Sequence, residues 1–391
     1  MGNSQIIPYI LGLNKNKFYK FTIISFEKNN IPNSLKELIS KNDIKWYKLR
    51  FTPKYFFLLK FLDLIKIIIF PLLIIIFSKI DLVHCRGQLP ALPGMIAKKI
   101  LKKKFIFDCR GLWADERLDN KSWNKEYFIH NLTYIFFKKI ENILFSFSDH
   151  NIVLTTKVRD FLIENSKYDE KYFTTIPCSA NFNHFNILGS AQIINKKKEL
   201  GVNNYDFIIG YFGSISNIYH PDQMIKFFQF CKNIQKNTII LFFSDNFEYL
   251  KNNSNNFNNL DKKDYLLINS NYEELPIYYN ICDLTLSFVK NTHARKASSP
   301  TKIGESLACG VPVLSNRGIG DLDTHLNFNK ISIIDVNNDE ELKKISMLTK
   351  KIKSLNRHKI RNIGKKYYDL DTAIMKYEEI YKKLFSNNSF I

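Results

Sequence analysis

The residues best suited to hold an anion belong to the octet "SSPTKIGE", which ends at Glu305. The start of a helix leaves backbone N–H groups unpaired and carries a partial positive charge, so it can bind a phosphate. We expect Ser299 to be the N-cap and Pro300 the first helical residue, which places Thr301 and Lys302 at the same end. Glu305, three residues after Lys302, could accept hydrogen bonds from a diol such as a ribose. The alternative is a capped surface helix with an i, i+3 Lys–Glu pair.

A second candidate anion site is "GYFGSIS", which contains Gly213 and Ser214 and follows an apolar run. Small residues after a strand let backbone amides approach an anion. The segment is not a G-x-G-x-x-G match and has no lysine at P-loop spacing, so alone it is a weak indication. Together with the octet, it favours a nucleotide diphosphate as the ligand.

Polar side chains also follow apolar runs in the first half of the chain. His84 and Arg86 come after "IDLV", Asp108 and Arg110 come after "FIF", and residues 155–157 come after "NIVL". Open parallel sheets bind ligands at the carboxyl ends of their strands. These loops are therefore candidates to line a cleft that the ligand bridges.

The elements that must position these residues alternate along the chain. Short apolar runs are separated by longer amphipathic ones, which is the pattern of parallel α/β sheets. The runs that read as strands are "YKFTIISF", "IDLVHC", "KKFIFDCR" and "DHNIVLTT", then "DFIIGYFG", "NTIILFFS", "DYLLINS", "CDLTLSFV", "VPVLSN" and "ISIIDV". Polar turn residues at 176–186 separate the two series, so we expect two domains.

Composition agrees with a large globular protein. The 391 residues are 45% hydrophobic and 14% aromatic, enough to bury two sizeable cores. The net charge of +20 favours negatively charged partners, such as phosphates, an anionic membrane face or nucleic acid. The abundance of Lys, Asn, Ile and Phe fits a bias in genome composition equally well.

Cysteine usage and the N-terminus favour a cytoplasmic protein. The six cysteines are scattered singly, without a C-x-x-C pair or zinc spacing, so we expect reduced thiols. "MGNSQIIPYILGLNKNK" lacks the basic start and clean apolar run of a cleavable signal peptide. Ile6 also stands where a myristoylation signal needs Ser or Thr.

One segment, Tyr55–Asp81, is hydrophobic enough to suggest contact with a membrane. Its longest uncharged run, Ile67–Phe77, is about half of the ~20 residues that span a bilayer, and Pro71 interrupts it. We expect either an interfacial helix with basic flanks on the cytoplasmic leaflet or a core helix that covers a parallel sheet.

The segment "SSPTKIGESLACGVPVLSNRGIGD", together with "IIGYFGSIS" about a hundred residues earlier, resembles the donor domain of GT-B glycosyltransferases of the family 4 type. "DLVHCRGQLPALPGMIAKKILKKKFIFDCRGLWADE" is similar to the acceptor-domain half of bacterial members that build surface polysaccharides. "KKYYDLDTAIMKYEEIYKKLF" resembles the terminal helix that crosses back to the first domain. The resemblance covers nearly the whole chain, and its most specific part is the block from Thr301 to Asp321.

The resemblance implies a GT-B fold of class α/β, with two Rossmann-like domains and a cleft between them. Residues 1–185 would bind the acceptor, residues 186–370 would bind the nucleotide sugar, and residues 371–391 would form the crossover helix. The start of the chain resembles the first helix and second strand of the family, so the resemblance implies that the first strand of the first domain is absent before Met1. Either the true start lies upstream or the first domain is weakened.

The resemblance also assigns roles on the donor side. Glu305 matches the second Glu of the family's E-x7-E motif, which binds the donor ribose, whereas the first Glu falls on Ala297. The family residues expected to hold the diphosphate correspond here to Gly213, Ser214, Lys302 and the amides of Ser299 to Thr301. The Arg that usually follows the glycine loop is missing; Tyr219 or His220 lies nearby, and Lys296 or Arg295 could supply the charge instead.

On the acceptor side, Asp108 and Arg110 fall where the family often has a reaction-centre His or Asp, and His84 and Arg86 lie at the neighbouring strand end. The implied reaction is a retaining transfer of sugar from a nucleotide-diphosphate sugar to a hydroxyl of a glycan or lipid-linked glycan. Lys302, with Asp108 and Arg110, forms the expected catalytic set. No metal or other cofactor is expected, and the two "DLD" segments, the first at Asp321, are expected to be structural.

The sequence leaves other interpretations of the function open. A non-catalytic relative is suggested by Ala297 and the missing first strand. An epimerase of the same fold would need cleft carboxylates and histidines, and a phosphorylase would need a pyridoxal lysine; neither is evident. A nucleic-acid-binding protein is suggested by charge alone, since no motif or basic stripe with aromatics is present.

Overall fold

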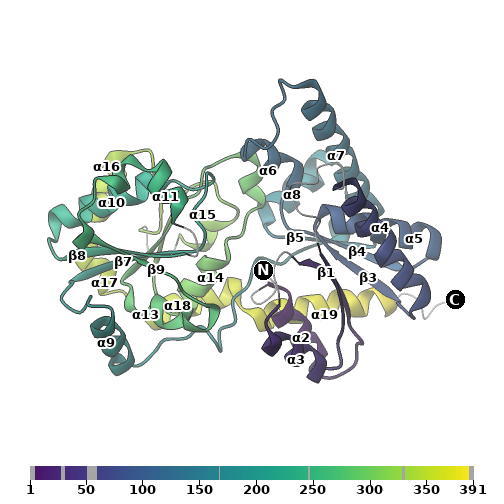
Figure 1. The fold of residues 1–391 in the computed structure, drawn as a ribbon, viewed down its shortest axis with the longest axis horizontal. Coiled ribbons are helices and arrows are strands. Elements are labelled where there is room, and N and C mark those ends of the chain that lie inside the picture. The colour runs from purple at the N-terminus through teal and green to yellow at the C-terminus, as the bar shows by residue number, and fades with distance from the viewer. Residues whose placement is uncertain are drawn as a thin grey trace.

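The computed structural model describes residues 5–27, 31–50, 60–166, 168–244, 247–327 and 331–386. They form two α/β domains that lie side by side (Figure 1). The N-terminal domain contains strands β1–β6 and the C-terminal domain contains β7–β12. This arrangement confirms the α/β class and the two-domain organisation expected from the alternating pattern.

The strands of the N-terminal domain are all parallel but form two separate sheets. Their bounds are β1 Thr22–Glu27, β2 Lys45–Arg50, β3 Leu82–Arg86, β4 Lys104–Cys109, β5 His150–Val153 and β6 Phe173–Thr175. β1 pairs with β2, and the other sheet has the order β3-β4-β5-β6. In the strand order 3-2-1-4-5-6 of a doubly wound sheet, the first strand lies between the second and the fourth. Here β1 does not pair with β3, so the strands of this domain form two sheets.

Helices cover both faces of the four-stranded sheet. The helices of this domain are α2 Ile7–Asn14, α3 Asn33–Lys41, α4 Lys60–Phe77, α5 Gln88–Leu101, α6 Trp113–Asp119, α7 Phe128–Phe147, α8 Thr156–Ser166 and the 3-10 turn η2 Glu170–Tyr172. Buried side chains of α5, α7 and α8 share one hydrophobic cluster with β4 and β5, whereas α2 packs on the opposite face.

The C-terminal domain has one six-stranded parallel sheet of order β12-β11-β10-β7-β8-β9. Its strands are β7 Phe207–Phe212, β8 Thr238–Phe243, β9 Tyr265–Ile268, β10 Leu284–Ser287, β11 Val313–Asn316 and β12 Ile333–Ile334. The central strands β7 and β8 are buried along their whole length, as expected for a sheet covered on both faces.

The helices of this domain form a layer on each face of its sheet. They are α9 Ser190–Glu199, α10 Pro221–Ile234, α11 Glu248–Asn253, α12 Asn255–Asn258, α13 Leu275–Ile281, α14 Thr301–Ala308, α15 Leu322–His325, α16 Asp339–Ser346, α17 Thr349–Lys353 and α18 Arg357–Tyr368, with the 3-10 turns η3 Lys262–Asp264, η4 Tyr272–Glu274 and η5 His293–Ala297. α10 and α16 pack together on one face, and α13, α14 and α18 cover the other.

The last helix, α19 (Leu370–Ser386), follows α18 directly and returns to the N-terminal domain. Figure 1 shows it in yellow, running from the junction of the domains below strands β3 to β5 of the N-terminal domain. Its buried side chains, including Tyr377 and Tyr381, pack with α2 against the sheet. The helix therefore crosses between the domains, as the resemblance implied.

Each strand that the sequence predicted is present, whereas β2 and β6 were not predicted. β2, "KWYKLR", lies at a sheet edge and is largely exposed, so it lacks an apolar run. β6 is a three-residue edge strand, too short to give a pattern. The cysteines, all within the described residues, form no disulfide, and five of them are buried.

α4 is a single helix that continues through Pro71. The sequence predicted that Tyr55–Asp81 forms either an interfacial helix or a core helix; residues 55–59 of this segment lie outside the described residues. One side of α4 packs on α5, while Ile69, Ile76 and Phe77 are exposed, Phe77 to 83%. Within the described ranges, no helix is both long and apolar enough to cross a bilayer.

Candidate functional site

Lys302 lies in the first turn of α14 and points into the loop that follows β7. Its ammonium nitrogen is buried and has no hydrogen-bond partner among the described residues. The nitrogen lies 4.2 Å from the ring centroid of Tyr211 and 4.5 Å from that of Tyr219. A buried cation without a hydrogen-bond partner is costly, so this arrangement favours the binding of an anion.

The loop after β7 is shaped by Gly213. Its φ of +100° lies in the region that favours glycine, and its N–H donates to the carbonyl of Phe243 at 2.9 Å. A β-carbon on Gly213 would lie 3.5 Å from Nζ of Lys302. The next residue, Ser214, is exposed, and its carbonyl accepts a hydrogen bond from Tyr211. The two loops predicted to hold phosphate are thus brought together.

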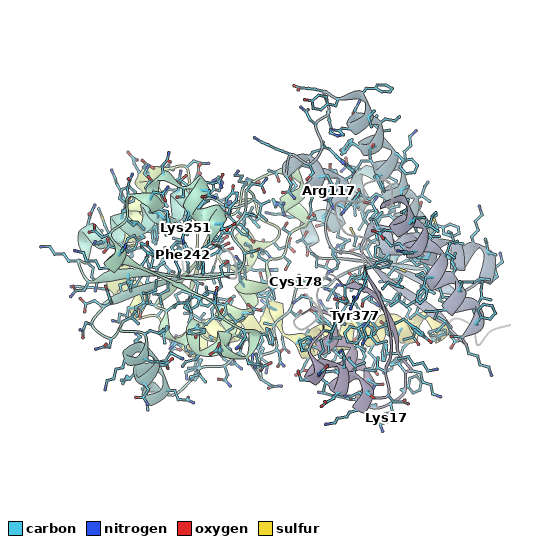
Figure 2. All side chains as sticks on the ribbon, viewed as in Figure 1. Lys17, Arg117, Cys178, Phe242, Lys251 and Tyr377 are labelled. Atoms are coloured by element: carbon cyan, nitrogen blue, oxygen red, sulfur yellow. The ribbon has the colours of Figure 1, made fainter. Side chains whose placement is uncertain are left out.

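The start of α14 differs from the expectation. The helix begins at Thr301, with Pro300 in extended conformation as the N-cap and without a side-chain cap. The prediction that Ser299 is the N-cap is therefore wrong. Its hydroxyl oxygen instead accepts a hydrogen bond of 3.1 Å from the N–H of Cys178 in the N-terminal domain. Figure 2 shows Cys178 at the junction of the two domains.

Glu305 lies one turn further along α14 and is only 7% exposed. The hydroxyl of Tyr279 donates to Oε2 of Glu305 at 2.9 Å, and the Tyr279 ring stacks on Phe212 with centroids 3.7 Å apart. Burial raises the pKa of Glu305 to about 7, although Tyr279 and Lys302 act in the opposite direction. The carboxyl group therefore changes charge near neutral pH and lies beside the unpaired cation.

Asp108, at the end of β4, is completely buried. Its carboxylate contacts Arg110 at 3.3 Å, His84 at 3.5 Å and Arg86 at 4.0 Å, and it accepts a hydrogen bond of 3.1 Å from Tyr377 of α19. Burial alone would raise the pKa of Asp108, but the neighbouring Arg110, His84 and Arg86 hold it below its ordinary value. The four residues predicted at these strand ends are thus brought together around one ionised carboxylate.

The C-terminal helix α19 covers the cluster around Asp108, and the sequence did not predict this contact. Tyr381 is hydrogen-bonded to Nδ1 of His84 at 2.7 Å, and Tyr377 rises from α19 toward the sheet (Figure 2). Asp108 and its tyrosine partner are 269 positions apart in the chain. The Asp108 carboxylate therefore meets protein groups and not a solvent-filled cleft.

Arg110 connects this cluster to the donor loops. One guanidinium nitrogen lies 3.2 Å from the sulfur of Cys178, whose N–H binds Ser299. The chain of contacts thus runs from Asp108 through Arg110 and Cys178 to the residue before Pro300. The two groups of predicted site residues are neighbours across the domain junction.

The turn η5 holds the remaining predicted residues. Lys296 is exposed, and its carbonyl accepts a hydrogen bond of 2.7 Å from Thr155 of the N-terminal domain. Arg295 is buried and pairs with Glu116 at 3.9 Å. Ala297 is buried in the hydrophobic cluster of the N-terminal domain. The position that holds a carboxylate in the E-x7-E pattern therefore serves here as an apolar contact between domains.

Asp321 joins the domains at another point. Its two carboxylate oxygens accept hydrogen bonds from the N–H groups of Thr156, at 2.6 Å, and Lys157, at 3.0 Å, at the start of α8. Asp323 of the same "DLD" segment pairs with the Lys157 side chain. These contacts confirm the structural role predicted for this segment. In the described part of the chain, no group of three or more His, Cys, Asp or Glu could hold a metal ion.

Two family models match the chain: "Glycosyl transferases group 1" over residues 192–367 and "Glycosyltransferase Family 4" over residues 34–183. No curated protein matches it. Among solved structures, Anabaena HepE in complex with UDP and glucose is similar at 15% identity, with 96% of this chain and 95% of that chain covered and a TM-score of 0.70.

Two further structures share the fold. A glycosyltransferase from Rickettsia africae is 18% identical, with 99% of this chain and 97% of that chain covered and a TM-score of 0.69. WaaG, described as a glycosyltransferase involved in lipopolysaccharide biosynthesis, is 10% identical, with coverages of 96% and 95% and a TM-score of 0.66. At these identities, the likeness concerns the fold.

Proposed function

The chain is a glycosyltransferase of the family 4 type with the GT-B fold, and from this premise we propose that its donor is a nucleotide-diphosphate sugar. The observation that carries the proposal is the buried ammonium of Lys302, which has no partner among the described residues and lies against the Gly213 loop. A diphosphate is an anion that suits both the Lys302 ammonium and the Gly213 loop. Two HepE structures, one in complex with UDP and glucose and one with UDP-glucose, support the same class of donor.

In this proposal, the diphosphate lies between the Gly213–Ser214 loop and the first turn of α14. Lys302 and the unpaired N–H groups after Pro300 stabilise the negative charge that develops on the phosphate as the sugar leaves. Because these groups supply positive charge at the leaving group, we propose that transfer requires no metal ion. The resemblance to family 4 supports the further proposal that transfer proceeds with retention. Lys296 is exposed near the same turn and adds a further cation.

Glu305 is proposed to hold the ribose of the donor. A carboxylate accepts hydrogen bonds from two adjacent hydroxyls, and Tyr279 fixes its orientation from the opposite side. Asp108 is proposed to act through Arg110, as a positioning residue, because the carboxylate is buried while Arg110 reaches Cys178 at the junction. His84 and Arg86 keep that carboxylate charged.

The acceptor is proposed to be a hydroxyl of a glycan or a lipid-linked glycan, in the synthesis of a surface polysaccharide. WaaG, a similar structure with a role in lipopolysaccharide biosynthesis, supports this class. The outer surfaces of α4 and α7 support peripheral contact with the inner face of the cell membrane. They expose large apolar side chains, among them Ile69, Phe77, Phe128 and Leu132.

The donor proposal is tested by titrating the protein with UDP, GDP, ADP and CMP while following its thermal unfolding, with and without a metal chelator. We expect one diphosphate to raise the unfolding temperature equally in both conditions. Stabilisation that the chelator abolishes would overturn the metal-independent mechanism. The absence of any stabilisation would overturn the donor assignment and favour a non-catalytic relative.

A further inference from the structure

A second polar region, lined by residues other than Lys302, lies in the N-terminal domain. A cavity of about 410 Å³ opens between α6, α7 and α8, with His293 of η5 at its edge. This volume is within the range of pockets that bind small ligands. None of the residues assigned to the donor lines it.

The inner wall of the cavity carries two buried carboxylates. Asp115 is 7% exposed and accepts hydrogen bonds of 2.9 Å from both the Tyr134 hydroxyl and Nζ of Lys138. Glu141 is 2% exposed and pairs with Lys138 through Oε1, while its buried Oε2 has no hydrogen-bond partner among the described residues. A buried polar atom without a partner is costly, so Glu141 can gain from a ligand that donates a hydrogen bond.

Aromatic rings complete the cavity. Phe161 of α8 and His293 of η5 contact each other edge to face, with ring centroids 5.5 Å apart, and the ring of Tyr134 lies on the α7 side. Apolar C–H faces of a ligand can pack on such rings, while its hydroxyls reach the carboxylates. The lining thus combines hydrogen-bond acceptors with flat apolar surfaces.

The cavity is next to the proposed donor loops. Asp119, which lines it, accepts a hydrogen bond from the hydroxyl of Thr292, beside His293. The carbonyl of the following Asn120 accepts a hydrogen bond of 3.3 Å from Asn217, four residues after Gly213. A ligand in the cavity would therefore lie beside the loop proposed to hold the diphosphate, on the acceptor domain.

We propose that this cavity binds a sugar unit of the acceptor, an inference that rests on the proposed function. Lys125 and Lys138 also line the cavity, but Lys138 is paired with Asp115 and Glu141. The carboxylates of Asp115, Asp119 and Glu141 outnumber these ammonium groups, so the lining offers no excess positive charge to the donor diphosphate or to the phosphate of a lipid carrier. A neutral ring with several hydroxyls supplies the hydrogen-bond donor that the buried Oε2 of Glu141 lacks. The charges of the two sites thus separate the anionic donor from the neutral part of the acceptor.

The test is saturation-transfer NMR on the full chain with methyl glycosides of glucose, galactose, mannose and N-acetylglucosamine. Asn165 lines the cavity from α8, and Asn165→Trp would fill it, whereas the neighbouring Glu164 does not line it and Glu164→Trp is the matched control. We expect transfer to at least one glycoside, lost in Asn165→Trp and retained in Glu164→Trp. Glu141→Gln, a change of similar shape, should weaken the same binding about tenfold.

Nucleotide-induced stabilisation is measured on the same samples. If a nucleotide stabilises all variants equally but no glycoside shows transfer, or transfer persists in Asn165→Trp, the sugar subsite is overturned while the donor proposal stands. If glycosides bind as expected but no nucleotide stabilises the protein, the donor proposal fails and the sugar site remains. Circular dichroism establishes that each variant is folded; if Asn165→Trp does not fold, Glu141→Gln decides, and unchanged glycoside affinity in it overturns the subsite.

Discussion

Nζ of Lys302 lies 3.5 Å from the position that a β-carbon on Gly213 would occupy, so the loop after β7 and the first turn of α14 are adjacent. These residues belong to segments separated by three strands, β8 to β10, and meet because β7 and β10 are neighbours in the sheet. The donor proposal depends on this relationship, and the first two predictions test it from each side.

Gly213→Ala should reduce both stability and nucleotide affinity. Its φ of +100° is unfavourable for alanine, which costs about 1–3 kcal/mol, while the space around the new methyl group is adequate. Gly201→Ala is the control, because Gly201 also has positive φ (+68°) but has open space around it and does not contact Lys302. Chemical denaturation should show a loss in both variants, and nucleotide titration a loss only in Gly213→Ala. Equal affinities would contradict the loop's role.

Lys302→Met should separate stability from binding. Removal of a buried ammonium without a hydrogen-bond partner relieves a desolvation cost but also loses the cation–π contacts with Tyr211 and Tyr219, so the unfolding free energy of the ligand-free protein should change little. Affinity for the diphosphate should fall at least tenfold, since hydrogen bonds to charged groups contribute ~1.5–3 kcal/mol. Lys251→Met, at an exposed position of α11, is the control (Figure 2). A Lys302→Met protein that binds nucleotide normally would remove the main support for the donor site.

Glu305 should make stability depend on pH. Its folded pKa, about 7, is above the ordinary value of 4.5, so the folded protein holds the proton more tightly than the unfolded chain does. This contribution is fully present below about pH 4.5 and is lost as the pH rises through 7; it amounts to about 3 kcal/mol. In Glu305→Gln, the fall in unfolding free energy over this range should be smaller. A wild-type and a variant curve of the same shape would contradict the prediction.

Glu305→Gln should also weaken nucleotide binding. If the ribose requires the carboxylate, wild-type affinity rises as the pH passes upward through 7, and Glu305→Gln shows low affinity at every pH. Calorimetric titration at several pH values measures both. Full affinity in Glu305→Gln would exclude the ribose assignment.

Asp321→Ala should destabilise the protein by about 0.5–2 kcal/mol, because the α8 N–H groups of Thr156 and Lys157 lose their cap. Asp321→Asn keeps one acceptor oxygen but places an amide NH2 opposite the second N–H group, so it should lose part of this stability. Denaturant unfolding of the two variants gives the comparison. If both variants were as stable as the wild type, the two hydrogen bonds to α8 would make no contribution to stability and the prediction would be wrong.

The double substitution Phe77→Glu with Phe128→Glu should weaken binding to vesicles of anionic phospholipid. These rings are 83% and 79% exposed, so their replacement should not affect folding, whereas burial in lipid would be lost. Ile194→Glu, on the exposed side of α9 in the other domain, is the control. Sedimentation with vesicles at low salt measures the effect. Wild-type protein that remains in the supernatant would remove the membrane proposal.

Much of the fold follows from local patterns. "FIIGYF" and "TIILFF" are apolar throughout because β7 and β8 are buried on both faces. The polar residues after these runs marked the strand ends, and the sheet brought Lys302 to Gly213 as expected. β2 was missed because an exposed edge strand leaves no apolar pattern.

The sequence by itself determined the alternation of strands and helices, the two domains and the residues at the strand ends, because hydrophobic period and turn residues are local properties. Only the tertiary structure decided what those residues contact. Tyr377 donates a hydrogen bond to Asp108, and the N–H of Cys178 donates one to the hydroxyl of Ser299. Helices α6, α7 and α8 enclose a polar cavity. These contacts join positions far apart in the chain, so they depend on how α19 and the two domains pack and not on any local pattern.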